Sequence, residues 1–193
     1  MTREVLISPR ATARLVVTMP PQPSRLAEAL AADIASDYVT LTPTTDAFRH
    51  LASLARERFT IMIPYIDSVG ADWAGEMFEN TVATERTLII RDAAQLTRCG
   101  TAGRRLERVT TRILEYGGRD LNEETFHAKI VLADGVAAYI GSANLLRRSK
   151  LANLECGMLV EGPAVHAVKV LLDAVTAVAE QNPGVSRVRD RQQ

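Results

Sequence analysis

The sequence predicts an α/β fold in which a mixed β-sheet is flanked by helices on both faces. Short apolar runs alternate along the chain with segments of helical periodicity, the pattern of a sheet layered against helices. Asp134-Gly135 stands between two apolar runs, and Asp-Gly at such a place is a strong signal for a hairpin turn. The hairpin makes at least two strands antiparallel, so the sheet is expected to be mixed.

Length and composition favour one domain. A chain of 193 residues is the usual size of a single domain. We expect the domain to span residues 14–182, after an N-terminal extension of residues 1–13 and before a flexible tail of residues 183–193. The 23 basic and 23 acidic side chains balance, which gives no support for a nonspecific nucleic-acid binder but leaves room for a local basic groove.

The cysteines and the apolar runs indicate the setting. Cys99 and Cys156 lack the close spacing of a metal site or a redox pair, which favours a reducing compartment. No run of apolar residues approaches the length of a membrane span. The expected location is the cytoplasm, with no membrane partner.

The first third of the chain alternates strand and helix. An apolar run at 14–20 predicts a strand that ends at a proline pair. Ser24 is placed as the N-cap of a helix over 24–36, whose apolar residues recur every four positions. A second strand is expected at 38–43 and a second helix at 45–57.

The middle of the chain continues this alternation. Apolar runs predict strands at 59–66 and 87–92, with a short helix between them at 71–83. Trp73 in that helix is expected to be a core residue. The section 91–118 is polar and interrupted by glycine, and we expect one helix within it.

The last third carries the hairpin and a long helix. Strands are expected at 127–133, 136–142 and 153–163, and a helix at 164–181. Cys156 is one residue from Glu155 on a strand, and we expect it in the core. The apolar stripe of the last helix is expected to contain Val165, Val168, Leu171, Leu172, Val175 and Val178.

Polar residues gather in one stretch, FHAKIVLADGVAAYIGSANL at 126–145. His127 and Lys129 are two residues apart on a predicted strand, so their side chains leave the same face. The hairpin returns Ser142 and Asn144 to the side of that strand. Phosphoryl transfer requires such a patch, because it needs a nucleophile or acid-base group and fixed donors for the phosphorus oxygens.

This stretch reads His-x-Lys-(x4)-Asp-(x6)-Gly-Ser-x-Asn and resembles the HKD motif of the phospholipase D superfamily. The motif is present once, from His127 to Asn144. The likeness extends to the following strand, with its acidic residue Glu155, and to a Pro-Tyr loop at Tyr65. It implies a phospholipase D-like fold with a single HKD half-unit. The sequence also resembles the phospholipase D-like component of bacterial DISARM phage-defence systems.

The resemblance implies a role for each catalytic residue. His127 is the nucleophile that forms a phosphohistidine intermediate. Lys129 and Asn144 bind the nonbridging phosphate oxygens, and Ser142 adds a supporting hydrogen bond. Glu155 holds the imidazole in its working tautomer.

Other residues near the motif have different expected roles. Asp134 belongs to the motif, but its turn position suggests a structural role, and Gly141 is expected to permit close packing. Tyr65 either lines the pocket or is an ordinary loop residue. Three basic residues that follow Asn144 either form a solvated face or contact flanking phosphates at the rim of the site; they are Arg147, Arg148 and Lys150.

One copy of the motif implies a dimer. Displacement at phosphorus needs one group to attack and another to protonate the leaving oxygen. The other histidines, His50 and His166, lie on predicted helices without such neighbours. The expected solution is a homodimer with the site on its two-fold axis and one His127 from each subunit. No metal or cofactor is expected, since two copies of Lys129 supply positive charge.

The motif indicates the chemistry more sharply than the substrate. Our interpretation is a nuclease-type phosphodiesterase acting on nucleic acid, with a role in phage defence and protein partners in a defence complex. One alternative is a phospholipid hydrolase or phosphatidyl transferase. Another is a scaffold subunit that binds phosphate or DNA without turnover.

Overall fold

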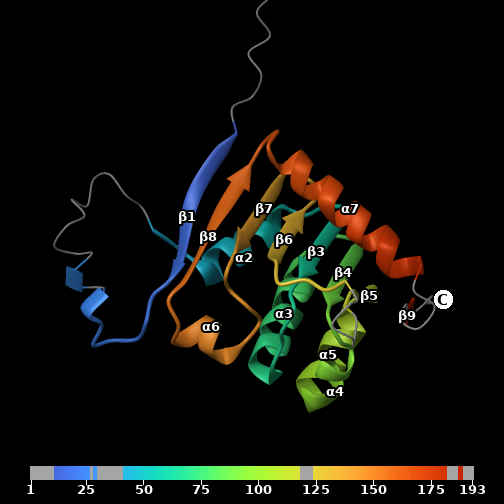
Figure 1. Cartoon of the computed structure of the whole chain (residues 1–193), viewed down its shortest axis with the longest axis horizontal. Helices are drawn as coiled ribbons and strands as arrows, with labels where there is room; N and C mark the ends of the chain where they lie inside the picture. The colour runs from blue at the N-terminus through green and yellow to red at the C-terminus, as the bar shows by residue number, and fades with distance from the viewer. Residues whose placement is uncertain (1–10, 27, 30–40, 118–123, 182–186, 189–193) are drawn as a thin grey trace, which may run out of the picture.

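The computed structural model describes residues 11–26, 28–29, 41–117, 124–181 and 187–188. Within these residues the sheet has nine strands in the order β2-β1-β8-β7-β6-β3-β4-β5-β9 (Figure 1). The strands are β1 Thr12–Thr18, β2 Thr42–Pro43, β3 Arg58–Met62, β4 Glu85–Ile90, β5 Arg112–Glu115, β6 Lys129–Ala133, β7 Ala137–Gly141, β8 Glu155–Glu161 and β9 Arg187–Val188. The helices are α2 Thr44–Leu54, α3 Ser68–Asn80, α4 Ala94–Arg98, α5 Gly100–Val109, α6 Arg147–Leu151 and α7 Val165–Gln181.

Helices cover both faces of the sheet, and the predicted fold class is confirmed. Helix α7 crosses one face, while α2, α3 and α5 pack on the other (Figure 1). Each layer of helices encloses its own apolar core. Strands β3, β4 and β5 are parallel, whereas β6, β7 and β8 are antiparallel to their neighbours, so the sheet is mixed.

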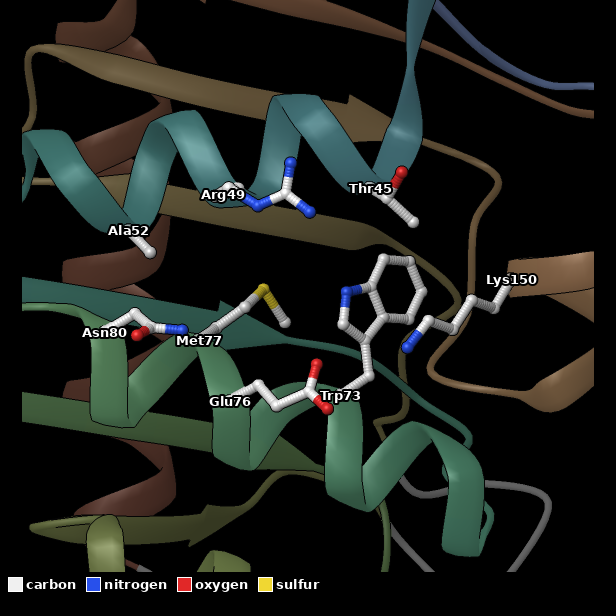
Figure 2. A pocket seen from close by; sticks show the side chains of 8 residues that line it. All are labelled: Thr45, Arg49, Ala52, Trp73, Glu76, Met77, Asn80 and Lys150. Carbon is white, nitrogen blue, oxygen red and sulfur yellow. The ribbon is translucent and has the colours of Figure 1, made fainter.

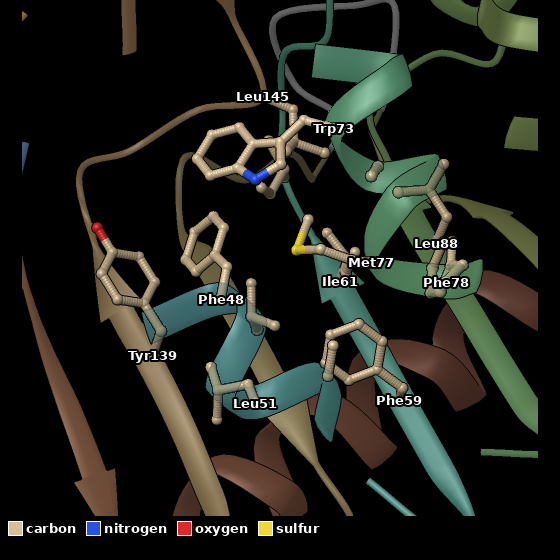
Figure 3. Close-up of a cluster of buried hydrophobic side chains, with 14 of the residues drawn as sticks. Phe48, Leu51, Phe59, Ile61, Trp73, Met77, Phe78, Leu88, Tyr139 and Leu145 are labelled. Atoms are coloured by element: carbon tan, nitrogen blue, oxygen red, sulfur yellow. The ribbon is translucent and has the colours of Figure 1, made fainter. Parts of the chain in front are cut away.

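The larger core is built around aromatic side chains. Phe48 of α2 stacks on Trp73 of α3 with ring centroids 4.9 Å apart. The same ring meets Tyr139 of β7 edge-on, also at 4.9 Å (Figure 3). Trp73 is 4% exposed, which confirms it as a core residue. These contacts tie two helices to the strand that leads to Gly141.

The predicted hairpin is present, and its turn uses the expected backbone. Asp134 has φ 50° and Gly135 has φ 78°. Val136 N donates to the Ala133 carbonyl and closes the turn. Both central residues are left-handed because that conformation matches the twist of the two strands.

The expectation of one helix in 91–118 was wrong. The section contains α4, α5 and the strand β5. Gly100, the first residue of α5, has φ 59°, a conformation that glycine adopts at little cost. The chain turns there, so α4 and α5 are separate helices.

Cys156 is exposed, which corrects its expected place in the core. Strand β8 turns Glu155, Gly157 and Leu159 toward the buried side. Cys156 faces the other side, on which Val160 at the far end of β8 packs against the core under α7, while Cys156 itself stays exposed. Side chains on a strand alternate between the two faces of a sheet, but this alternation does not show whether a helix packs on each face.

The apolar stripe of α7 is narrower than expected. Leu171 is 51% exposed and Val178 is 41% exposed. The buried side chains of α7 are Val165, Leu172, Val175 and Ala179. Because the helix rests on the sheet alone, only the line of residues that touches the sheet is buried.

Part of the expected N-terminal pattern lies outside the described residues. Residues 25–26 and 28–29 are helical, and residues 27 and 30–36 of the expected helix at 24–36 are not described. The expected strand at 38–43 is described only at its end, as β2. Among the described helices, none has the length and apolar character needed to cross a membrane.

Candidate functional site

Strand ends bring the candidate residues to one edge of the sheet. Because β6 runs antiparallel to β3 and to β7, the start of β6 meets the ends of β3 and β7. Strand β8 begins at the same edge, since it is antiparallel to β7. Lys129 pairs with Gly141 in this register. The hairpin therefore places the first and last parts of the predicted motif side by side.

His127 and Lys129 lie in contact at this edge. Strand β6 begins at Lys129, so His127 lies just before the strand rather than on it. The Lys129 Nζ atom is 2.8 Å from His127 Nδ1 and donates to the His127 carbonyl at 2.6 Å. His127 is exposed, whereas Lys129 is 3% exposed. A buried ammonium thus supports an imidazole that faces solvent.

Burial changes the acidity of Lys129. Loss of hydration lowers the pKa of its ammonium, and the negative charge of Glu155 opposes this shift. A buried cation with few anions nearby favours the binding of another anion. The electrostatics of this edge therefore suit a phosphate group.

Glu155 contacts Ser142 and Asn153 rather than His127. Ser142 Oγ donates to Glu155 Oε2 at 2.6 Å, and Asn153 Nδ2 donates to Oε1 at 3.3 Å. The Ser142 hydroxyl also accepts the Cys156 N–H at 3.0 Å. The carboxylate is 6% exposed. Its place beside the motif matches the sequence prediction, but no contact with His127 of the same chain is present among the described residues.

Asn144 has an unused polar atom. Its Oδ1 is buried without a hydrogen-bond partner in the described part of the chain. Such a position is rare in folded proteins and calls for an explanation, such as a bound ligand. An amide can flip and exchange its oxygen and nitrogen. The free position can thus serve an acceptor or a donor on a ligand.

Asp134 and Gly141 make packing and turn contacts. Asp134 lies at the far end of β6 from Lys129 and accepts three backbone N–H bonds from residues 56–58, at 2.6, 3.0 and 2.6 Å. A Cβ atom on Gly141 would lie 2.3 Å from the hydroxyl oxygen of Tyr139. That tyrosine is fully buried. The glycine is needed because the ring occupies the space of a side chain.

Tyr65 reaches the site from the loop after β3. Its ring centroid is 6.0 Å from that of His127, and the side chain is 39% exposed. Arg91 Nη1 donates to the Tyr65 hydroxyl at 2.8 Å, and its guanidinium lies 5.6 Å from the ring centroid. Arg91 was not among the predicted residues. The available signal was its position directly after the apolar run of β4.

The basic residues after Asn144 have different surroundings. Arg147 and Arg148 are exposed at the start of α6. Lys150 turns toward Trp73, with its Nζ 5.2 Å from the ring centroid. The two side chains line a small cavity of about 80 Å³ between α2 and α3 (Figure 2). Of the three predicted rim residues, Lys150 therefore does not join the His127 cluster.

The described residues contain no group of three or more His, Cys, Asp or Glu side chains arranged to hold a metal ion. The polar groups that converge at the edge are an imidazole, an ammonium, a carboxamide and a carboxylate with its serine. These groups can attack phosphorus, bind its oxygens and move protons.

Comparison with known proteins gives a family and three similar folds. Residues 48–175 match the family described as "Cardiolipin synthase, PLD-like domain". Nuc from Salmonella typhimurium, a phospholipase D family member, shares 14% identity over 87% of this chain and 93% of its own, with a TM-score of 0.53. NucT from Helicobacter pylori shares 16% identity over 89% of this chain and 97% of its own, with a TM-score of 0.54.

A larger protein contains the same fold. The phosphatidylserine synthase of Haemophilus influenzae shares 15% identity over 94% of this chain but only 41% of its own, with a TM-score of 0.51. At these identities the likeness shows the fold alone. No curated protein sequence matches the chain.

Proposed function

Because this chain belongs to the PLD-like domain family described for cardiolipin synthase, within the phospholipase D superfamily of phosphodiesterases, we propose that it cleaves phosphodiester bonds in nucleic acid. The reaction needs no metal ion and passes through a phosphohistidine. The observation that carries the proposal is the pairing of an exposed His127 with a buried Lys129, whose Nζ is 2.8 Å from the ring. All the proposed catalytic residues lie within the part of the chain that matches the family.

The proposed active site forms between two subunits. This chain spans 93% of Nuc and 97% of NucT but 41% of the phosphatidylserine synthase, so its residues correspond to one phospholipase D-like unit. One unit holds one exposed His127, and an in-line displacement needs two proton-active groups. In a two-fold dimer the second group is His127 of the partner subunit.

Each step balances with these groups. The Nε2 lone pair of His127 forms a bond to phosphorus while the bond to the leaving oxygen breaks. The imidazolium of the partner subunit's His127 gives that oxygen a proton. Water then attacks the phosphohistidine and passes a proton to the same imidazole, and the phosphorus–nitrogen bond breaks.

Lys129 and Asn144 bind the nonbridging oxygens. Burial disfavours the positive charge on Lys129 Nζ. A negatively charged phosphate oxygen beside this ammonium stabilises the charged form. A second oxygen binds at Asn144, whose buried Oδ1 position has no partner among the described residues and becomes a donor when the amide flips. Both contacts strengthen as charge develops at phosphorus, so they favour the transition state.

Glu155 and Ser142 control the tautomer. Attack through Nε2 requires the proton to be on Nδ1, yet the Lys129 ammonium lies 2.8 Å from Nδ1 in the free chain. We propose that substrate draws Lys129 away and that Glu155, held by Ser142, accepts the Nδ1–H bond in the dimer. A carboxylate in that role also stabilises the imidazolium. Asp134 keeps a structural role at its turn.

A phospholipid substrate is the second candidate. It is favoured by the family match to cardiolipin synthase and by the fold of the phosphatidylserine synthase. The third candidate is a scaffold that binds phosphate without turnover, and the zero net charge favours it over a stand-alone nuclease. A role in phage defence with protein partners stays a prediction from the sequence.

Cleavage of labelled oligonucleotides in EDTA tests the proposal. Wild type is expected to cut, and His127→Ala is expected to lose the activity while remaining folded and dimeric by native mass. Hydrolysis of phospholipid vesicles with no oligonucleotide cleavage would favour the second candidate. Tight oligonucleotide binding without any hydrolysis would favour the scaffold.

A further inference from the structure

A polar cavity of about 330 Å³ lies beside Tyr65, and the proposed chemistry does not use it. Its wall includes Tyr65, Arg91, Asp92, Gln95, Arg98 and Glu115. The volume falls in the range of small-ligand pockets, about 300–1,000 Å³. The cavity is large enough for a molecular group rather than a single ion.

The cavity lies where open α/β sheets bind ligands. Strands β3, β4 and β5 run parallel. Tyr65 and Arg91 follow β3 and β4, Glu115 ends β5, and the other three side chains of the wall lie in or just before α4. Crevices at the carboxyl ends of parallel strands are the usual ligand sites of such sheets. Tyr65 forms the side nearest the site, with its ring 6.0 Å from the His127 ring. A group in the cavity would therefore be next to the reacting phosphate.

Gln95 makes the wall rigid. It is 8% exposed, its Nε2 donates to the Pro64 carbonyl at 3.0 Å, and its Oε1 accepts the Ile66 N–H at 3.1 Å. These two bonds hold the backbone on both sides of Tyr65. The ring is positioned before any ligand arrives, which lowers the entropy cost of binding.

The wall offers both donors and acceptors. Arg91 donates to Tyr65 and has no carboxylate partner within ion-pair distance among the described residues. Arg98 lies 3.6 Å from Asp92, and Glu115 accepts the Ala93 N–H. A nucleobase edge carries donors and acceptors in one plane. An acyl chain carries neither and would leave these charged groups without water.

We propose that this cavity is a flanking subsite that holds the nucleobase next to the scissile phosphate of single-stranded nucleic acid. The base stacks on Tyr65, and Arg91 contacts the base edge or its phosphate. This proposal rests on the proposed function of the His127 site. A single strand is expected because a paired base would first have to unstack and unpair from its duplex before it could enter the pocket.

The test uses oligonucleotides with one abasic position. In wild type, the bond beside the abasic position should be cut with a kcat/KM about 5- to 150-fold lower, the effect of losing one base–aromatic stack. Tyr65→Ala should remove most of this penalty, because it has already lost the stack. Tyr65→Phe keeps the ring, so the abasic position should lower its kcat/KM as much as it does in wild type. Arg91→Ala should weaken cleavage of the intact strand, whereas Arg104→Ala, an exposed arginine on α5, should leave it unchanged.

Several results would overturn the subsite. The first is that the abasic position lowers kcat/KM by the same factor in wild type and in Tyr65→Ala. The second is that it does not lower kcat/KM in wild type. The third is loss of phosphatidylglycerol-vesicle hydrolysis in Arg91→Ala with oligonucleotide cleavage intact, which would assign the cavity to a lipid headgroup.

Failure of the proposed function would look different. Hydrolysis of bis(p-nitrophenyl) phosphate reports the His127 chemistry alone, since this ester carries no base. Should wild type hydrolyse neither substrate, fluorescence anisotropy of an intact and an abasic strand still decides the subsite. A weaker binding of the abasic strand in wild type but not in Tyr65→Ala would support it, and equal binding would refute it.

Discussion

Asp134 is predicted to serve stability rather than catalysis. Its carboxylate accepts three backbone N–H bonds from residues 56–58, at 2.6, 3.0 and 2.6 Å. Hydrogen bonds to a charged group contribute about 1.5–3 kcal/mol each, but two of these bonds are exposed, one is partly buried, and all three share one carboxylate. We therefore expect Asp134→Ala to lower the free energy of unfolding by about 3 kcal/mol, including the greater strain of alanine than of aspartate at φ 50°.

The assay compares urea denaturation with activity per folded molecule. For a domain of this size, 3 kcal/mol corresponds to a melting temperature lower by about 6–12 °C. Asp134→Asn keeps one acceptor oxygen, so its free energy of unfolding should fall by about half as much as in Asp134→Ala. In both variants the kcat of the folded fraction should stay within about threefold of wild type, because Asp134 touches no reacting group. A wild-type unfolding midpoint combined with a large loss of kcat would refute this reasoning.

Three further substitutions test the core and one hydrogen-bonded pair. Gly141→Ala puts a Cβ 2.3 Å from the Tyr139 hydroxyl oxygen, so the free energy of unfolding measured in urea should fall by about 1–3 kcal/mol. An unchanged unfolding midpoint would show that Tyr139 does not fill this space. Trp73→Ala removes a ring that is 4% exposed and should lower the free energy of unfolding by about 3–5 kcal/mol, measured by denaturation followed with circular dichroism. A change near zero would show that the ring is not packed. The hydrogen bond from His50 lowers the pKa of Glu161 below its ordinary value of 4.5, so the pair stabilises the fold above that pH and the effect is lost as the pH falls below it. His50→Ala should therefore lower the free energy of unfolding by up to about 1 kcal/mol at pH 7, since the pair is partly exposed. The difference between variant and wild type should vanish well below pH 4.5, and a difference that grows as the pH falls would contradict this reasoning.

Local chemistry explains the features that sequence could predict. Asp134-Gly135 specifies a two-residue turn because both positions require positive φ. Once the hairpin is known, register alone brings Lys129 opposite Gly141. The cluster around His127 was therefore predictable from spacing, although β6 begins two residues later than expected.

Tertiary arrangement explains the features that sequence could not predict. Cys156 alternates away from Glu155, as expected, but the core under α7 reaches only Val160 on that face of β8 and leaves Cys156 exposed. Gln95 and Arg91 border Tyr65 only because β4 pairs with β3 and α4 folds back over the strand ends. Periodicity within a segment contains no information about which segment packs against it.

The activity of a mixed dimer tests the shared site most directly. Wild-type and His127→Ala chains with different affinity tags can be co-expressed, and the heterodimer purified through both tags. A site that needs both imidazoles predicts oligonucleotide cleavage at least about 100-fold slower than in the wild-type dimer, the usual cost of a missing general acid. A heterodimer with about half of the wild-type activity would mean that each chain works alone, and the shared active site would be wrong.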